Sequence, residues 1–122
     1  MTDYAIENEI QEKGLTAPRI TPADIEANII GEHYFTAGEA IAALGQPTDP
    51  NSPTDLLTFC VLVLHNGFTV TGESACASPE NFDAELGRKI ARRNAEAKIW
   101  PLMGYELRGK LCRTAGAGTC ND

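Results

Sequence analysis

The chain has 122 residues and 43% of them are apolar, which is enough to bury the core of one domain and leaves no room for a second. Ten Lys and Arg residues against 17 Asp and Glu residues give a net charge of −7, which argues against a protein whose whole surface binds nucleic acid or anionic lipid. We therefore expect an acidic, soluble protein that binds neither DNA nor RNA nor a membrane.

The charge is unevenly distributed along the chain. Residues 1–55 hold ten acidic residues against only Lys13 and Arg19. Residues 88–113 hold eight basic residues against Glu96 and Glu106, which gives this segment a net charge of +6. Because a positive field attracts anions, an anionic ligand is expected to bind there.

Neither the cysteines nor the histidines are spaced like metal ligands. The four cysteines form no CxxC pair and the two histidines follow no repeated spacing, so we predict no zinc site. The N-terminus lacks the basic region and apolar run of a signal peptide, and the longest apolar run, residues 59–64, is too short to cross a bilayer. We expect a reducing, cytoplasmic setting with free thiols, although Cys112 and Cys120 could close a small loop if oxidised.

The first elements in the chain are short. Residues 1–20 show no sustained period, which indicates a flexible arm or a short, loosely held helix, with order beginning near Thr21. A helix is expected to start at Thr21, with Pro22 at its first position, and Gly31 can end it. A strand is predicted to follow over residues 33–36, which are aromatic and β-branched.

Residues 37–55 are predicted to form an inserted loop. Residues 38–45 could form two helical turns, and three prolines then interrupt regular structure: Pro47, Pro50 and Pro53. Because this connection is longer than usual, we expect it to be functional, mobile or ordered by a partner.

The clearest local signal is a β-hairpin. Residues 56–65 are β-prone and nearly all apolar, Asn66-Gly67 follow, and residues 68–72 alternate apolar residues with Thr. The Asn-Gly pair tolerates the positive φ angles of a type I′ turn, so the two runs should pair. The first run is predicted to be a central strand buried on both faces, and the second to face solvent or a partner on one side.

A second helix is predicted to begin at Ser78-Pro79 and to end before Pro101. Its apolar stripe is expected to comprise Phe82, Leu86, Ile90 and Ala97. Gly87 costs a helix about 1 kcal/mol relative to Ala, which indicates close approach by another backbone or a ligand. Residues 102–111 are expected to hold a short helix or strand, and residues 114–122 a frayed, flexible tail.

These elements predict the α+β class. The expected fold is a small antiparallel sheet with an Asn-Gly hairpin, packed by an N-terminal helix and a long C-terminal helix. A single domain is predicted over residues 22–113, with a flexible arm over residues 1–20 and the inserted loop over residues 37–55.

Few residues could carry catalysis. Glu73 and Ser74 could be a base and a nucleophile, but adjacent residues on a strand point to opposite faces. Cys60 is interpreted as a small buried hydrophobe and Cys76 as a buried loop thiol, although a thiolate just before a helix would be stabilised. We therefore predict a protein that is not an enzyme and uses no cofactor.

The basic residues of segment 88–113 allow two interpretations. They can form a solvated helix face with i, i+4 partners such as Glu85 and Lys89. Alternatively, arginines line a cleft for phosphates while an aromatic side chain stacks on a base. The residues of this second interpretation are Arg88, Arg92, Arg93, Arg108 and Arg113, with Phe82, Trp100 or Tyr105 as the aromatic face.

Three segments in order resemble a phage and prophage protein family. They are LHNGFTVTGESAC at residues 64–76, NFDAELGRKIA at residues 81–91 and IWPL at residues 99–102. Their joint occurrence is a specific signal, and the resemblance covers about residues 22–111. The family was first known as orphan phage gene products and resembles the one that contains the Thoeris anti-defence sponges.

The resemblance implies a non-catalytic function in the cytoplasm of a bacterial host cell. Such a protein binds and sequesters a cyclic nucleotide signal made by host immune TIR domains, chiefly glycocyclic ADP-ribose isomers, and some relatives hold cyclic di- or trinucleotides. It also implies self-association, as dimers that can assemble to hexamers, with ligand pockets at subunit contacts.

The resemblance assigns ligand contacts residue by residue. They are Phe82 for the base, Arg88, Arg92 and Asn94 for the helix side of the pocket, and Arg108 and Arg113 for phosphates. Arg93 departs from the family because relatives often carry an acid there, and Met103 is also atypical. These departures leave open which nucleotide this chain prefers.

Two other functions stay open at this point. An interaction protein would inhibit a host protein by direct contact, through the hairpin face and the acidic loop, and would bind no small ligand. A cyclic-nucleotide phosphodiesterase would convert its ligand to product over time. Recovery of unaltered ligand from the protein would distinguish sequestration from both.

Overall fold

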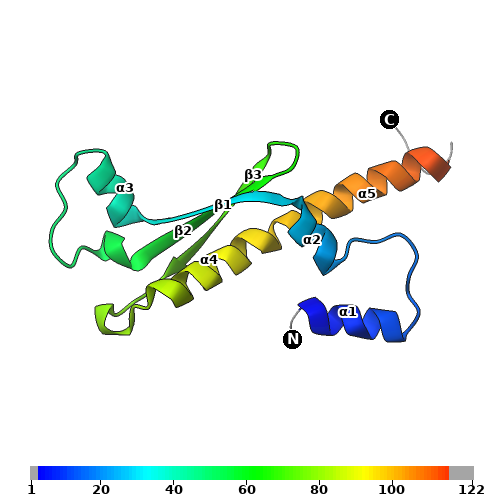
Figure 1. Cartoon of the computed structure of the whole chain (residues 1–122), viewed down its shortest axis with the longest axis horizontal. Helices are drawn as coiled ribbons and strands as arrows, with labels where there is room; N and C mark the ends of the chain where they lie inside the picture. The colour runs from blue at the N-terminus through cyan, green and yellow to red at the C-terminus, as the bar shows by residue number, and fades with distance from the viewer. Residues whose placement is uncertain (1–2, 116–122) are drawn as a thin grey trace. The chain divides into compact units, whose positions relative to one another are not determined.

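The computed structural model describes residues 3–115 and divides the chain into two compact units. One unit spans Ile29–Lys98 and contains the sheet (Figure 1). The other combines the helical segments that precede and follow it. The predicted α+β class is confirmed, whereas the predicted domain bounds, residues 22–113, stay a prediction.

The sheet has three antiparallel strands in the order β1-β2-β3. They are β1 (Ile29–Thr36), β2 (Leu57–Leu64) and β3 (Thr69–Ala75). The prediction that the apolar run forms the central strand is confirmed. The first strand begins earlier than expected, so Gly31 lies inside β1, beside a register shift, and does not end the preceding helix.

The hairpin turn between β2 and β3 differs from the predicted type I′ turn. Gly67 has a φ of 90°, but Asn66 has no positive φ, and a type I′ turn requires one at both central residues. The N–H of Gly67 instead donates to the carbonyl of Leu64 at 2.8 Å, and Leu64 N–H donates to Phe68 O at 2.8 Å. The loop is therefore three residues long, with glycine at the left-handed position.

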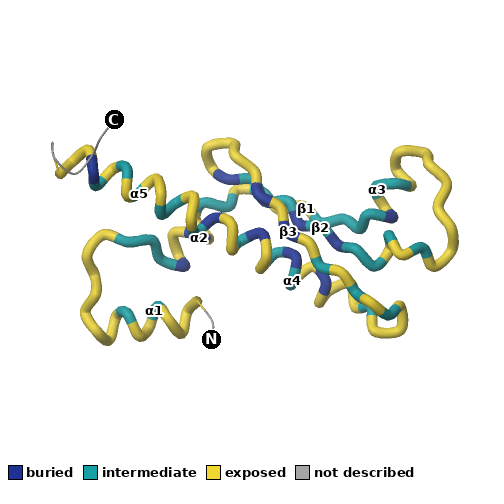
Figure 2. Tube along the Cα trace, turned by 180° about the vertical axis from the view of Figure 1, so that it is seen from behind, coloured by how far each residue is buried: buried dark blue, intermediate teal, exposed yellow. Residues whose placement is uncertain are grey.

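Burial in β2 alternates between the two faces of the sheet (Figure 2). Thr58, Cys60, Leu62 and Leu64 are buried, and the residues between them are half-buried. The prediction that both faces of this strand are buried is therefore wrong. The buried face is the one that helix α4 (Ala84–Ala97) covers, as Figure 1 shows.

Helix α4 packs on the sheet through small residues. Its buried positions are Gly87, Ala91 and Ala95, whereas Leu86 is 53% exposed, so the predicted stripe of larger apolar residues is wrong. The reason lies on β3, where a Cβ at Gly72 would lie 2.9 Å from the Asn94 carbonyl carbon and closer still to backbone atoms of Ala91 and Ala95. Backbone meets backbone here, so no large side chain fits between them.

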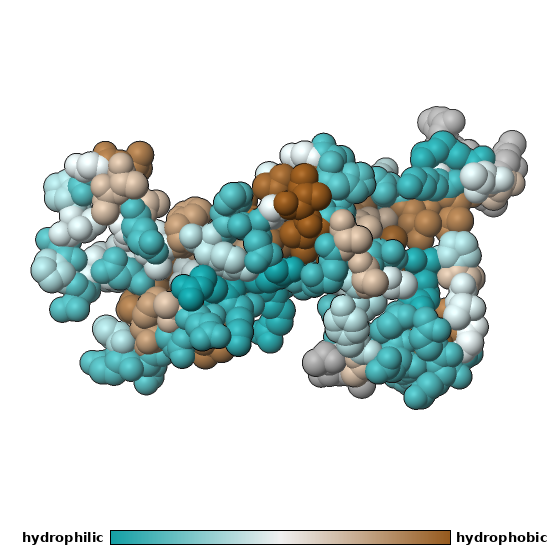
Figure 3. Space-filling model, viewed as in Figure 1, coloured by the Kyte–Doolittle hydropathy of each residue, from teal (hydrophilic) through white to brown (hydrophobic). Residues whose placement is uncertain are grey.

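The bounds of α4 also differ from those expected. Residues Pro79–Asn81 form a separate 3-10 turn, η2, and Asp83 caps α4 by accepting a hydrogen bond from Leu86 N at 3.0 Å. The helix ends at Ala97, before the predicted end at residue 100. Its outward side is mainly hydrophilic, as Figure 3 shows.

The segment predicted as an inserted loop is partly helical. Helix α3 (Ala37–Ala43) starts directly after β1, which agrees with the helical turns expected near residues 38–45. A 3-10 turn, η1 (Pro53–Leu56), precedes β2. Pro53 is compatible with this turn because it occupies the first position, where no N–H is needed. Gly38 is buried where a Cβ would overlap the Asp55 side chain, so α3 and η1 are in close contact.

The second unit consists of helices α1 (Asp3–Glu12), α2 (Pro22–Asn28) and α5 (Ile99–Ala115). Residues 1–20 therefore contain a helix, and regular structure begins well before Thr21. The predicted start of α2 is confirmed, since Thr21 and Asp24 exchange hydrogen bonds of 2.9 and 3.1 Å. Pro101 lies in the first turn of α5, where a missing N–H breaks no helical bond, so it does not end a helix as expected.

Two expectations at the C-terminus fall outside the described residues. The tail over residues 114–122 is described only to Ala115, and Cys120 lies beyond it, so its pairing with Cys112 stays a prediction. Cys60 and Cys76 are free, as predicted. Among residues 3–115, the structure contains no helix that is both long and apolar enough to span a membrane.

Candidate functional site

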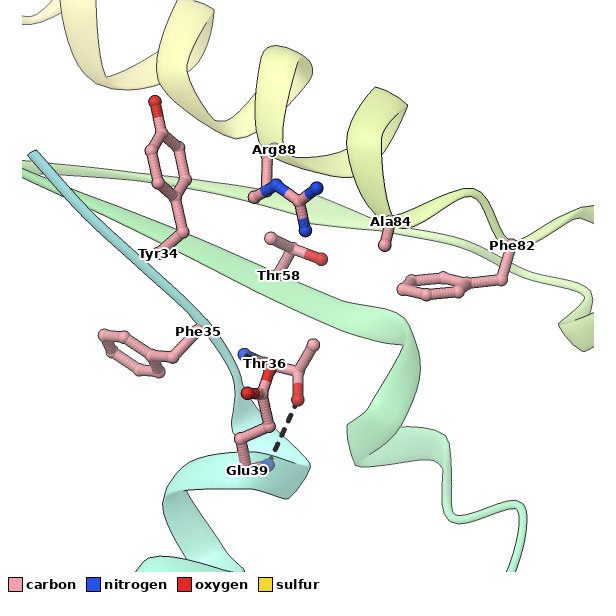
Figure 4. Close-up of a pocket in the computed structure, with 8 residues that line it drawn as sticks. All are labelled: Tyr34, Phe35, Thr36, Glu39, Thr58, Phe82, Ala84 and Arg88. Atoms are coloured by element: carbon pink, nitrogen blue, oxygen red, sulfur yellow. Dashed lines mark hydrogen bonds between the residues drawn. The ribbon is translucent and has the colours of Figure 1, made fainter.

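The candidate site is a pocket of about 240 Å³ in the sheet unit, beside the first turns of α4 (Figure 4). Strands β1 and β2, helices α3 and α4 and the residue after η2 all contribute to it. Its lining residues are Tyr34, Phe35, Thr36, Glu39, Thr58, Phe82, Ala84 and Arg88. Two of the predicted ligand contacts, Phe82 and Arg88, are thus brought together in one pocket.

Arg88 supplies the positive charge of the pocket. It lies one turn into α4, and Figure 4 shows its guanidinium group above Thr58. Among the described residues, none forms an ion pair with Arg88. Its five N–H donors can therefore bind an anion such as a phosphate without first breaking an internal bond.

Phe82 supplies the aromatic wall. It follows η2 and directly precedes Asp83, whose capping bond fixes the start of α4. Figure 4 shows its ring extending along the pocket on the same side as Ala84. An aromatic ring in this position can stack on a nucleobase.

Thr58 forms the floor between these two residues. It is 3% exposed, and a Cβ at Gly87 would lie 3.1 Å from its Oγ1. The atoms close to Gly87 therefore belong to a side chain and not to another backbone, and the approach of a ligand there stays a prediction. Any larger residue at Gly87 would press on the floor of the pocket.

The wall opposite α4 comes from the start of α3. Thr36 Oγ1 accepts a hydrogen bond from Glu39 N at 3.0 Å, and Glu39 Oε1 accepts one from Thr36 N at 3.0 Å. This reciprocal pair is a capping box, and it fixes the Glu39 carboxylate at the pocket. The Thr-x-x-Glu pattern of residues 36–39 could have predicted this helix start from the sequence.

Arg92, one turn after Arg88, is held by carboxylates. Its guanidinium group pairs with Glu32 of β1 and with Glu96, whose Oε1 lies 2.6 Å from Arg92 Nε.

Nearby, burial raises the pKa of the Tyr34 hydroxyl and of the Cys60 thiol. Cys60 has no exposed surface, so its interpretation as a small buried hydrophobe is confirmed.

The other predicted ligand contacts lie outside this pocket. The side-chain amide of Asn94 donates to the carbonyl of Glu73 at 2.8 Å, which joins α4 to the edge strand β3. Arg108 and Arg113 are exposed on α5 in the helical unit. The predicted pair of Glu85 and Lys89 is confirmed as an exposed ion pair at 3.5 Å.

The residues considered for catalysis form no such group. Glu73 pairs with Phe59 and Ser74 with Thr58 across the β2–β3 ladder, so their side chains point to opposite faces, as predicted. The Cys76 thiol donates to Ser78 O at 3.1 Å. Among the described residues, no three potential metal ligands lie together.

A second pocket, of about 270 Å³, lies in the helical unit. Its lining residues are Asp3, Ile6, Glu7, Ile10, Ile20, Pro22 and Trp100. Arg19 pairs with Glu7 through its two terminal guanidinium nitrogens, Nη1 and Nη2, at 2.5 and 2.7 Å, and lowers the pKa of that carboxyl to about 2. Trp100 is half-buried here, so it packs near α1 and α2 within its own unit.

Comparison with known proteins gives one match. A model of the phage protein (N4 Gp49/phage Sf6 gene 66) family matches residues 20–111. This range includes both walls of the pocket around Phe82 and Arg88. Neither the curated proteins nor the solved structures gave a match.

Proposed function

The chain belongs to the phage protein (N4 Gp49/phage Sf6 gene 66) family, and from this premise we propose that it binds a cyclic nucleotide signal of host immunity and withholds it without turnover. The resemblance to the Thoeris anti-defence sponges suggests glycocyclic ADP-ribose as the first ligand to test. This function places the protein in the cytoplasm of the infected bacterium.

One observation carries the proposal: Phe82 lines the same pocket as Arg88, which has no ion-pair partner within residues 3–115. A cyclic nucleotide presents flat bases and phosphates, and these two side chains match both parts. Stacking on an aromatic ring contributes about 1–3 kcal/mol per base, and hydrogen bonds to a charged group contribute about 1.5–3 kcal/mol. Sequestration requires this affinity and no reacting group.

The size of the pocket supports self-association. Pockets that enclose a whole drug-sized ligand usually have about 300–1,000 Å³, and this one has about 240 Å³. One protomer would therefore surround only part of a cyclic dinucleotide-sized ligand. Nanomolar retention corresponds to about −12 kcal/mol, so we propose that a second copy supplies the remaining contacts, in a dimer or a hexamer.

The test is ligand recovery. The purified protein is incubated with glycocyclic ADP-ribose, free ligand is removed, the protein is heat-denatured and the released nucleotides are identified by mass spectrometry. We expect intact ligand at nearly one equivalent per pocket. Accumulation of a hydrolysis product would indicate a phosphodiesterase, and retention of nothing from a panel that includes cyclic di- and trinucleotides would reject the proposal.

A second candidate function is inhibition of a host protein by direct contact. The sheet face opposite α4 carries half-buried apolar residues, among them Phe35 and Phe59, whose rings stack with centroids 5.5 Å apart. Such a face could bind another protein. A stable partner in a pull-down that is equally retained by Arg88→Ala would favour this candidate.

A further inference from the structure

The pocket contains two opposite charges that do not neutralise each other. Arg88 lies on the α4 wall and Glu39 on the α3 wall. Within the described part of the chain, no ion pair joins them, although both line the same pocket. A pocket with a separated cation and anion suits a ligand that has an anionic group at one end and a hydrogen-bond donor at the other.

The Glu39 carboxylate is held in place before any ligand binds. Its Oε1 accepts the hydrogen bond from Thr36 N at 3.0 Å, and no described residue bonds to Oε2. The turn that carries it is fixed by the packing of Gly38 against Asp55. A preorganised acceptor of this kind loses little conformational freedom when a ligand binds, so little of its hydrogen-bond energy is lost to ordering the side chain.

We propose that Glu39 selects nucleotides whose base carries an exocyclic amino group. This inference rests on the proposed function. If a phosphate binds Arg88 and a base stacks on Phe82, the edge of the base can reach the α3 wall of this small pocket. An ionised carboxylate only accepts hydrogen bonds, so it binds an amino group and gains no hydrogen bond from a base that carries only a hydrogen atom at that position.

The selectivity that follows is for adenine over purine, the base without the amino group. Purine differs from adenine only because a hydrogen atom replaces the amino group, whereas hypoxanthine would offer the carboxylate a new donor at its protonated N1. Because Glu39 is exposed, a hydrogen bond from the amino group should have an effect at the low end for bonds to charged groups. We expect about tenfold tighter binding of the adenine form.

The experiment measures a ratio of affinities. Isothermal titration compares glycocyclic ADP-ribose with its counterpart that carries unsubstituted purine in place of adenine, for the wild type and for Glu39→Gln. Glutamine keeps an amide oxygen for the capping bond from Thr36 N but presents an amino group to the ligand. Glu85→Gln is the control with matched charge, because Glu85 lies on α4 and pairs with Lys89 outside the pocket.

The result expected is a wild-type preference of about tenfold for adenine that Glu39→Gln abolishes and Glu85→Gln preserves. A merely structural role of Glu39 would weaken both ligands equally and leave the ratio unchanged. An unchanged ratio, or a wild type that binds both ligands equally, overturns the inference while the proposed function stands. If the wild type binds neither ligand, the proposed function falls together with the inference.

Discussion

The two halves of α4 use the same helix in different ways. Around Ala91 and Ala95 its backbone lies directly against Gly72 of β3, and Arg92 is held by two carboxylates. Around Ala84 and Arg88 the helix borders a pocket, and Arg88 has no ion-pair partner among the described residues. The C-terminal half fixes the helix on the sheet, and the N-terminal half leaves a charged side chain at the pocket.

The comparison separates an arginine that is available for a ligand from one that other side chains of the fold hold. Arg88 and Arg92 are one turn apart, carry the same charge and belong to the same basic segment. Only the neighbours on β1 and α4 distinguish them, since Glu32 and Glu96 neutralise Arg92. Each prediction below tests one side of this difference.

The largest effect is expected where backbones meet. Gly72→Ala places a Cβ against backbone atoms of Ala91, Asn94 and Ala95, which cannot rotate away. We expect the free energy of unfolding to fall by about 3 kcal/mol, measured by urea denaturation. Gly104→Ala is the control, because nothing lies within 4 Å of its Cβ and alanine stabilises a helix interior by about 0.5–1 kcal/mol. Equal stability of wild type and Gly72→Ala would contradict the close packing.

The aromatic wall is expected to control affinity. Phe82→Ala removes the ring on which a base would stack, so binding of glycocyclic ADP-ribose should weaken by about 2 kcal/mol, or thirtyfold. Phe68→Ala is the matched control, since Phe68 is 56% exposed in the hairpin turn and lines none of the pockets described. Equal weakening by both variants would place the binding site elsewhere.

The anchoring side of α4 is tested by Arg92→Ala. This change leaves Glu32 and Glu96 without their shared partner, and because the ion pairs are partly exposed we expect a loss of about 1 kcal/mol in unfolding free energy. Lys89→Ala breaks a more exposed ion pair on the same helix and should lower the free energy of unfolding by only about 0.3 kcal/mol. If Arg92→Ala instead abolishes ligand binding at unchanged stability, Arg92 contacts the ligand.

The smallest effect concerns alkaline pH. Burial raises the pKa of Cys60 above 9.0 and that of Tyr34 above 10.0, so the folded protein holds these protons more tightly than the unfolded chain. The stabilisation is complete below pH 9.0 and is lost as the pH rises through the folded-state pKa values. Urea titrations at increasing pH should show a falling unfolding free energy, with a shallower slope in Tyr34→Phe. An identical slope in that variant would contradict the assignment.

The local signals in the sequence predicted much of the sheet unit. The apolar run before Asn66 predicted the central strand, because nearly continuous apolar residues are typical of a strand in the interior of a sheet. The turn type was missed, since Asn-Gly fits both a two-residue and a three-residue loop, and the hydrogen bond from Gly67 decides between them. The Thr21 helix start was predicted because capping is a local interaction.

The helix stripe and half of the site could not be predicted in this way. The spacing of large apolar residues predicted that Leu86 would be buried. In the structure, α4 lies so close to Gly72 that the small residues Ala91 and Ala95 take the buried positions. Glu39 and Thr58 come from other parts of the chain than the basic segment, and only the fold brings them to Phe82. Local patterns predict elements, whereas pairing between distant elements determines which charges remain available.

The central claim is that Arg88 binds the phosphates of an intact cyclic nucleotide. The direct measurement is isothermal titration of glycocyclic ADP-ribose into the wild type, Arg88→Ala and Arg93→Ala, followed by mass spectrometry of the recovered ligand. Arg93 is exposed on the same helix and lies outside the pocket, so both variants have the same net charge. We predict that Arg88→Ala weakens binding by about thirtyfold, that Arg93→Ala changes it by less than about threefold, and that the ligand is recovered unaltered. Equal affinities for the two variants, or a hydrolysed ligand, would contradict the claim.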